Sequence, residues 1–236
     1  MGLKYSIVKL QGAFFFKPYI PQNSLNLIDY LNKSIGSKFD GDPLILPIPS
    51  EAPPEIPRII LRNKDDALSF QLSLIRGDIV LKLPEDSTLD QSKKDFFDLV
   101  VKLFAAFIEY TKCDIIRLAY LPTLTYQTDS DASKFLLNNY CADTIKKKFS
   151  ENFYAFNLHL LKRWKENDNL KLNRWIRINT KRSTDAFAPE NEFHLDLDFN
   201  TWGEEKESGI FDIKAIEQFF NYTWEETLKI QKEIIP

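Results

Sequence analysis

The chain has few of the residues that build disulfide frameworks, zinc sites or nucleotide loops. Its 236 residues include two cysteines, one methionine and seven glycines. Cys113 and Cys141 lack CxxC spacing, so we expect neither a disulfide framework nor a zinc site, and a cytoplasmic location is the default. We also expect no secretion leader and no membrane span, because no charged-then-apolar start and no long apolar run occurs.

Several catalytic and binding classes are excluded by what the glycine and charge patterns lack. Gly36 and Gly41 have P-loop spacing, but Asp42-Pro43 stands where Lys-Ser/Thr is required. Neither GxGxxG nor GxSxG occurs, which excludes a dinucleotide fingerprint and a nucleophile elbow. The net charge of −3 shows that the chain as a whole is not built to seek nucleic acid or anionic membrane.

The segment Glu192–Phe199 alternates apolar and polar residues at every position. A period of two is typical of a half-buried β-strand, with one side in a core. The polar side carries three carboxylates and one of only two histidines, namely Glu192, His194, Asp196 and Asp198. This side is either a functional site or a solvated sheet surface.

A divalent metal is one interpretation of this strand. Asp196 and Asp198 would lie roughly 6–7 Å apart along it, close enough to converge on one Mg²⁺ or Mn²⁺, and His194 would favour Mn²⁺. A nuclease-like catalytic set would add Glu204 and Lys206, with the lysine polarising the attacking water. The simpler expectation is that no cofactor is bound.

Opposite charge blocks support a structural interpretation. Residues 160–182 are rich in lysine and arginine, whereas residues 185–207 are rich in aspartate and glutamate. If these segments pair antiparallel, cross-strand ion pairs would specify their register. The expected pairs are Lys171 with Asp198, Arg177 with Asp196, and Lys181 with Glu192.

The basic strand also allows a binding interpretation. Lys171, Trp175, Arg177 and Lys181 would share one face, so an aromatic ring would lie among cations. That pattern fits a single-stranded nucleic acid or a protein partner. Nucleic acid is possible but not favoured, because the neighbouring block is acidic.

The periodicities predict an α+β fold with an antiparallel sheet packed on two long helices. We expect strands near 4–16, 57–61, 68–74, 79–83, 114–127, 153–164, 170–181 and 192–200, and helices near 24–35, 88–112, 130–148 and 212–235. Strands in runs before a long helix predict two fused βββα halves, 1–128 and 129–236, which can also form a single domain. The proline-rich segment 43–57 is expected to be an extended connector whose Leu44 and Ile45 lie against the core.

Four segments carry a resemblance to a known family: Pro54–Leu61, Ile115–Tyr120, Leu195–Asp198 and a closing helix rich in phenylalanine. In these the chain resembles a sporadically distributed bacterial family of uncharacterised proteins, although it lacks a histidine in the closing helix. The resemblance implies a bacterial, cytoplasmic protein. Patchy distribution fits phage-defence or toxin–antitoxin loci.

The sequence favours a non-enzymatic binding or accessory protein that partners or regulates another bacterial protein. Two alternatives remain open. One is a divalent-metal-dependent hydrolase using His194, Asp196 and Asp198. The other is a single-stranded nucleic-acid binding protein using the basic strand. No membrane partner is expected, and the oligomeric state is open.

Overall fold

The computed structural model describes residues 3–49, 51–84, 87, 89–149, 155–167, 170–180, 191–202 and 211–234. Its strands are β1 (Lys4–Phe16), β2 (Leu44–Ile45), β3 (Ile59–Arg62), β4 (Leu68–Leu72), β5 (Arg76–Lys82), β6 (Ile115–Gln127), β7 (Asn157–Asn167), β8 (Leu170–Thr180) and β9 (Glu192–Thr201). Its helices are α1 (Ser24–Ser34), α2 (Leu89–Thr111), α3 (Ala132–Tyr140), α4 (Asp143–Phe149) and α5 (Ile213–Ile234).

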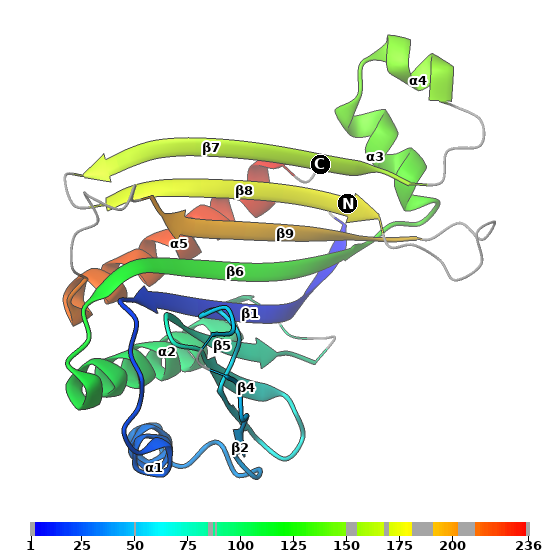
Figure 1. The fold of residues 1–236 in the computed structure, drawn as a ribbon. Helices are drawn as coiled ribbons and strands as arrows, with labels where there is room; N and C mark the ends of the chain where they lie inside the picture. The colour runs from blue at the N-terminus through cyan, green and yellow to red at the C-terminus, as the bar shows by residue number, and fades with distance from the viewer. Residues whose placement is uncertain are drawn as a thin grey trace.

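All nine strands of the described chain form one antiparallel sheet in the order β2-β3-β4-β5-β1-β6-β9-β8-β7 (Figure 1). The α+β class and the antiparallel sheet predicted from the sequence are therefore confirmed. The prediction of two long helices was incomplete, because the shorter α1, α3 and α4 accompany α2 and α5.

The strand order has an internal correspondence. β1 and β6 are paired at the centre, and each is flanked outward by the last, middle and first strand of a three-strand run that precedes a long helix. The run β3, β4, β5 leads into α2, and the run β7, β8, β9 leads into α5. Both long helices lie on the same side of the sheet (Figure 1).

One continuous core fills the space between the sheet and these helices. Alternate residues of β9, from Phe193 to Phe199, are at most 1% exposed and face this core, as their periodicity predicted. Phenylalanine rings provide much of the packing: Phe14 of β1 lies 4.2 Å from Phe104 and 4.8 Å from Phe107 of α2, measured between ring centroids. Offset and tilted ring pairs of this kind add to the stabilisation from buried area.

Two local predictions were wrong. The expected helix 130–148 is interrupted at Cys141, whose backbone is extended (φ −109°, ψ 151°), so α3 and α4 are separate. In the proline-rich segment, Leu44 and Ile45 form the short edge strand β2 and remain 48% and 45% exposed instead of entering the core.

No helix in the described residues is both long and apolar enough to cross a membrane.

Candidate functional site

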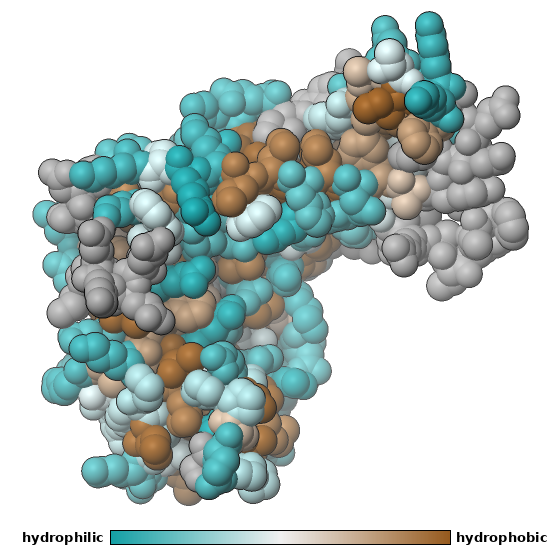
Figure 2. Space-filling model, turned by 45° about the horizontal axis from the view of Figure 1, so that its top comes forward, coloured by the Kyte–Doolittle hydropathy of each residue, from teal (hydrophilic) through white to brown (hydrophobic). Residues whose placement is uncertain are grey.

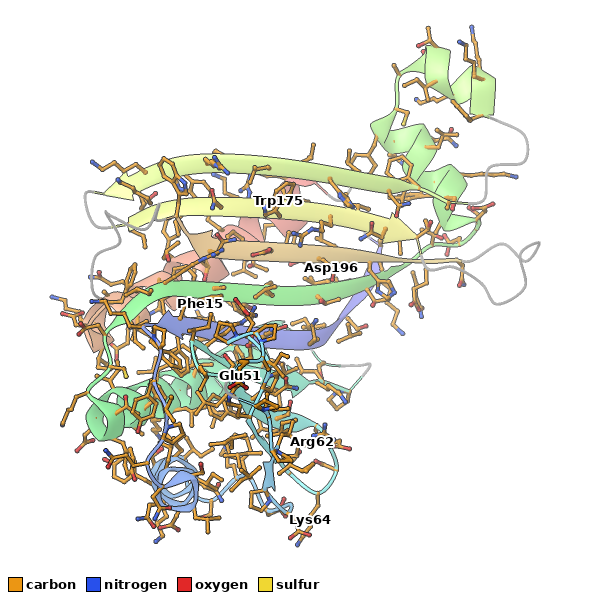
Figure 3. All side chains as sticks on the ribbon, viewed as in Figure 1. Phe15, Glu51, Arg62, Lys64, Trp175 and Asp196 are labelled. Carbon is orange, nitrogen blue, oxygen red and sulfur yellow. The ribbon has the colours of Figure 1, made fainter. Side chains whose placement is uncertain are left out.

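The sheet face opposite the core is covered by no helix of the described residues, and we call it the open face. Strand alternation assigns Phe15 to it from β1, Arg76 and Asp78 from β5, and Arg117 from β6. From β8 and β9 it receives Asn173, Trp175, Arg177, Asp196, Asp198 and Asn200. Figure 3 places Phe15, Asp196 and Trp175 on three strands of the sheet.

A connected set of hydrogen bonds crosses this face from β6 to β8. Arg117 Nη2 and Asn173 Nδ2 both donate to Asn200 Oδ1, at 3.1 and 3.0 Å. Asn200 Nδ2 donates to Asp198 Oδ1 at 2.9 Å, and Arg177 Nη2 donates to Asp198 Oδ2 at 3.3 Å. We call these five residues the open-face network. Asn200, only 4% exposed, is the buried centre of this network, and Arg117 is its exposed outer member.

Phe15 connects this network to β5. The guanidinium groups of Arg76 and Arg117 both lie over the Phe15 ring, 4.9 and 5.0 Å from its centroid. Arg76 Nη2 also donates to Asp78 Oδ1 at 2.6 Å, and Gln11 Nε2 donates to the same oxygen at 2.8 Å. Cation–π contacts and charge-assisted bonds therefore extend across β5, β1, β6, β9 and β8.

Electrostatics around Arg117 show how closely the charges are packed. Partial burial lowers the pKa of Arg117 below its ordinary value, the carboxylate of Asp198 raises it, and the positive charge of Arg76 lowers it again. Asp198 is thus surrounded by arginines from both neighbouring strands, β6 and β8. The negative charge of Asp198 offsets the repulsion between Arg117 and Arg177, which lie on the same face.

The observed register of β8 and β9 tests the expected ion pairs. Arg177 is directly opposite Asp196, as predicted, although its salt bridge runs diagonally to Asp198. The pairing of Lys171 with Asp198 was wrong: Trp175 is opposite Asp198, and the Lys171 ammonium lies 5.6 Å from the centroid of Trp202. Lys181 lies outside the described residues.

The candidate metal ligands of β9 already have protein partners. Asp196 Oδ1 accepts from Thr123 Oγ1 at 2.8 Å, and His194 Nδ1 shares a hydrogen bond of 2.9 Å with Thr125 Oγ1. A cation bridging Asp196 and Asp198 would have to displace Arg177 from Asp198. The described chain contains no cluster of three or more His, Cys, Asp or Glu side chains arranged to hold a metal ion. Glu204 and Lys206 of the nuclease-like set lie outside the described residues.

A second aromatic group lies beside the basic strands. Trp202 follows β9 and is 39% exposed, and its backbone N–H donates to the Lys171 carbonyl at 2.7 Å. Arg163 of β7 lies 5.8 Å from the Trp202 ring centroid, and Arg177 lies 5.4 Å from that of Trp175. The open face of β7 and β8 carries no acidic residue among the residues described.

Sequence reasoning found Trp175, Arg177, Asp196 and Asp198 but missed their partners. Phe15, Arg76, Arg117, Asn200 and Trp202 belong to the same surface, and they come from separate segments of the chain. An available signal was the alternation Arg117, Ala119, Leu121, Thr123 in β6, which marks a strand face different from the fully apolar one. That β6 lies beside β9, however, is a property of the fold that this alternation does not predict.

Comparisons with known proteins add little. No protein-family model and no curated protein matches this sequence. A solved structure of Methanococcus jannaschii TBP is similar at a TM-score of 0.35, with 9% sequence identity over 98% of this chain and 99% of that chain. A likeness at this TM-score carries no argument about fold or function.

Proposed function

We propose that this protein is a non-enzymatic binding protein whose open face binds another protein. The observation that supports this proposal is that the packed helices of the described residues lie on one side of a nine-stranded sheet. The other side presents side chains that are hydrogen-bonded to one another in the open-face network. A surface whose side chains are ordered before binding loses less entropy when a ligand arrives.

The composition of the open face favours a protein ligand. Arginine, tryptophan and phenylalanine are the side chains that contribute most strongly at protein interfaces, and Arg117, Trp175 and Phe15 lie here. The charges at the centre of the face are balanced, with Arg76, Arg117 and Arg177 accompanied by Asp78, Asp196 and Asp198. A phosphate backbone crossing the centre of the face would meet these carboxylates, whereas a protein surface can match both signs.

We infer that two fused halves build this surface. In this proposal β6 is the counterpart of β1, so the second half begins near residue 113 instead of 129. The first half contributes Phe15, Arg76 and Asp78, and the second contributes the whole open-face network. The proposal also includes a bacterial partner, such as a protein encoded in a phage-defence or toxin–antitoxin locus, in line with the family resemblance.

Two variants on the open face test the proposal. Trp175→Ala and Arg117→Gln remove open-face groups without touching the core, and Gln218→Ala on the exposed side of α5 is the matched control. A partner captured by the wild type is purified, and its Kd is measured against all four proteins. We expect at least a tenfold weaker Kd for each open-face variant and an unchanged Kd for the control.

Equal affinity of all four proteins would contradict the use of the open face. Hydrolysis of nucleic acid or nucleotide by the purified protein alone would contradict the non-enzymatic role. That assay is run with Mg²⁺ and with Mn²⁺, and any turnover is repeated in Asp196→Ala to identify the carboxylate strand as its source.

Single-stranded nucleic acid is a second candidate ligand, favoured by one observation. Trp175 and Trp202 lie among Arg163, Lys171 and Arg177, so bases could stack where cations meet phosphates. This proposal predicts that affinity for a labelled oligonucleotide falls steeply with salt and that Trp202→Ala weakens it. An oligonucleotide affinity that does not depend on salt would contradict it.

A further inference from the structure

Strand β7 ends the sheet on the side away from β2, and no strand of the described chain pairs with its outer edge. It is an edge strand of 11 residues, Asn157–Asn167. Figure 1 shows it as the outermost strand, with no other helix or strand running along its free side. Long unpaired edges are uncommon in proteins because they template pairing with another chain.

The hydrogen bonds to β8 show which main-chain groups of β7 point outward. The Thr180 N–H donates to the Phe156 carbonyl at 3.0 Å, and the register then pairs Leu158 with Ile178 and Leu160 with Ile176. In an antiparallel ladder hydrogen-bonded pairs alternate with non-bonded ones. The even-numbered residues therefore bond to β8, and His159, Leu161 and Arg163 direct their N–H and C=O groups away from it.

Apolar side chains flank this free edge. Leu160 and Leu161, on opposite faces of the strand, remain 45% and 42% exposed. Figure 2, turned to bring the upper edge of the sheet forward, shows a hydrophobic band where β7 lies. An added strand would place its own alternating side chains beside these two leucines.

The charge of the strand specifies its complement. β7 carries Lys162, Arg163 and Lys165, and its one acidic residue, Glu166, lies next to its last position. More cations lie near its start, where Tyr140 of α3 is 6.2 Å from Phe156 between ring centroids. A cavity of about 400 Å³ between α3 and α4 is lined there by Lys134, Lys146 and Lys147. An extended segment with negative side chains fits this edge best.

We propose that β7 is a strand-addition site, at which an extended acidic segment of a partner protein joins the sheet as a tenth strand. Main-chain hydrogen bonds to the outward groups of β7 provide affinity, and the basic side chains select an acidic sequence. This site uses the main chain at the free edge of β7, whereas the open-face network lies on β6, β8 and β9, so either proposal can fail without the other.

A second copy of this chain is the less favoured occupant. Antiparallel pairing of β7 with itself would bring together two strands that each carry Lys162, Arg163 and Lys165 with no acid between Asn157 and Lys165. Lysine on an edge strand commonly prevents such self-pairing. The same charges attract a strand of opposite sign.

The test uses a fluorescein-labelled octapeptide of alternating glutamate and valine, with a lysine–valine peptide as its control. Leu161→Pro removes one outward N–H, and proline is tolerated at an edge position whose N–H does not enter the ladder. Leu161→Thr is the matched variant that keeps the N–H. The double variant Lys162→Glu/Arg163→Glu reverses the charge without touching the main chain. Melting curves confirm that each variant is folded.

We expect the acidic peptide to bind the wild type and Leu161→Thr, and to bind Leu161→Pro at least tenfold more weakly. The charge-reversed variant should lose the acidic peptide and bind the lysine–valine peptide. If Leu161→Pro does not fold, the acidic peptide N-methylated at alternate amides takes its place, because this peptide keeps its charge but cannot pair with a strand, and we expect it not to bind.

Three results would overturn the proposal. Equal peptide affinity for Leu161→Pro and the wild type would show that the peptide binds through charge alone and does not pair with the main chain of β7. Displacement of the peptide by an eight-nucleotide oligo-dT that itself binds Leu161→Pro normally would identify a general polyanion site. A wild-type dimer in sedimentation that Leu161→Pro dissociates would identify a second copy as the occupant.

Discussion

At the residue scale, the hydroxyl of Tyr120 is a buried group without a hydrogen-bond partner in the described part of the chain. Such a group lowers stability, because its hydration is lost and not replaced. We therefore expect Tyr120→Phe to leave the free energy of unfolding unchanged or to raise it by about 1 kcal/mol. Urea denaturation measures the change.

Tyr222→Phe is the matched control for that substitution. The Tyr222 hydroxyl accepts a hydrogen bond from Trp164 Nε1 at 3.0 Å, which joins α5 to β7. Removing it should lower stability by about 0.5–1.5 kcal/mol. Equal losses in the two variants would show that the Tyr120 hydroxyl has a partner after all.

Buried tyrosines also predict loss of stability in alkali. Burial raises the pKa of Tyr140 to about 12 and raises the pKa of Tyr120 well above its ordinary value. In the unfolded chain these groups ionise near pH 10, whereas in the folded chain they stay protonated. Their contribution is therefore complete below about pH 10 and is lost as pH rises towards 12.

Urea midpoints from pH 8 to pH 11.5 test this dependence. We expect a plateau to about pH 10, then a fall that is shallower in Tyr120→Phe, which has one fewer group to ionise on unfolding. A midpoint that is constant up to pH 11.5 would contradict the burial of these tyrosines.

At the scale of elements, Gly77 sets how closely β5 and β1 can pack. It is opposite Phe14 in the ladder, and a Cβ at this position would lie 2.5 Å from two carbon atoms of the Phe14 ring. We expect Gly77→Ala to cost about 1–3 kcal/mol, because the ring is fixed among Phe104 and Phe107. Guanidinium denaturation gives the value.

Gly36→Ala provides the comparison. A Cβ at Gly36 meets no atom within 4 Å, but the backbone has φ +73°. Its cost should be the backbone preference alone, about 1 kcal/mol. If Gly77→Ala proves as mild as this or milder, the close packing of Phe14 against β5 is not as described.

An ion pair joins α5 to strand β8 of the sheet. Arg174 Nη1 lies 3.0 Å from Glu226 Oε2, and the two side chains are only 15% and 16% exposed. Glu226→Leu alone should cost about 2–3 kcal/mol, because it leaves a poorly hydrated guanidinium without its carboxylate. The double variant Arg174→Met/Glu226→Leu should recover most of that loss. A double variant less stable than either single variant would contradict this account.

Sequence periodicity predicted elements better than it predicted their contacts. Alternation from Phe193 to Phe199 was sufficient to place β9 half in the core, because a strand exposes every second residue. Register was harder to predict. The register that pairs Arg177 with Asp196 also places Lys171 opposite Trp202. The expected partner of Lys171, Asp198, lies four residues before Trp202 along the chain. The contacts of Phe15 and Arg117 depend on β1 and β6 being neighbours, which no local pattern encodes.

At the scale of the whole molecule, the two proposed halves lie on one core. Phe220 of α5 lies 5.4 Å from Phe97 and 5.9 Å from Phe104 of α2, and 6.0 Å from Tyr120 of β6, between ring centroids. Strands β1 and β6 are paired along almost their whole length. Neither proposed half can unfold without exposing the β1–β6 ladder and this ring cluster to water. We therefore expect the protein to unfold as one unit.

The four tryptophans make that expectation testable, because Trp164, Trp175, Trp202 and Trp224 all lie in the second half. Guanidinium unfolding followed by tryptophan fluorescence should therefore coincide with unfolding followed by circular dichroism, which reports on the whole chain. Phe220→Leu should shift both midpoints together, by about 1–2 kcal/mol. It should also lower, by the same amount, the free energy at which amides of β4 and β5 exchange hydrogen. If fluorescence shifts while those amides keep their protection, α2 and the first half hold together without α5, and the open face is built from two separately stable parts.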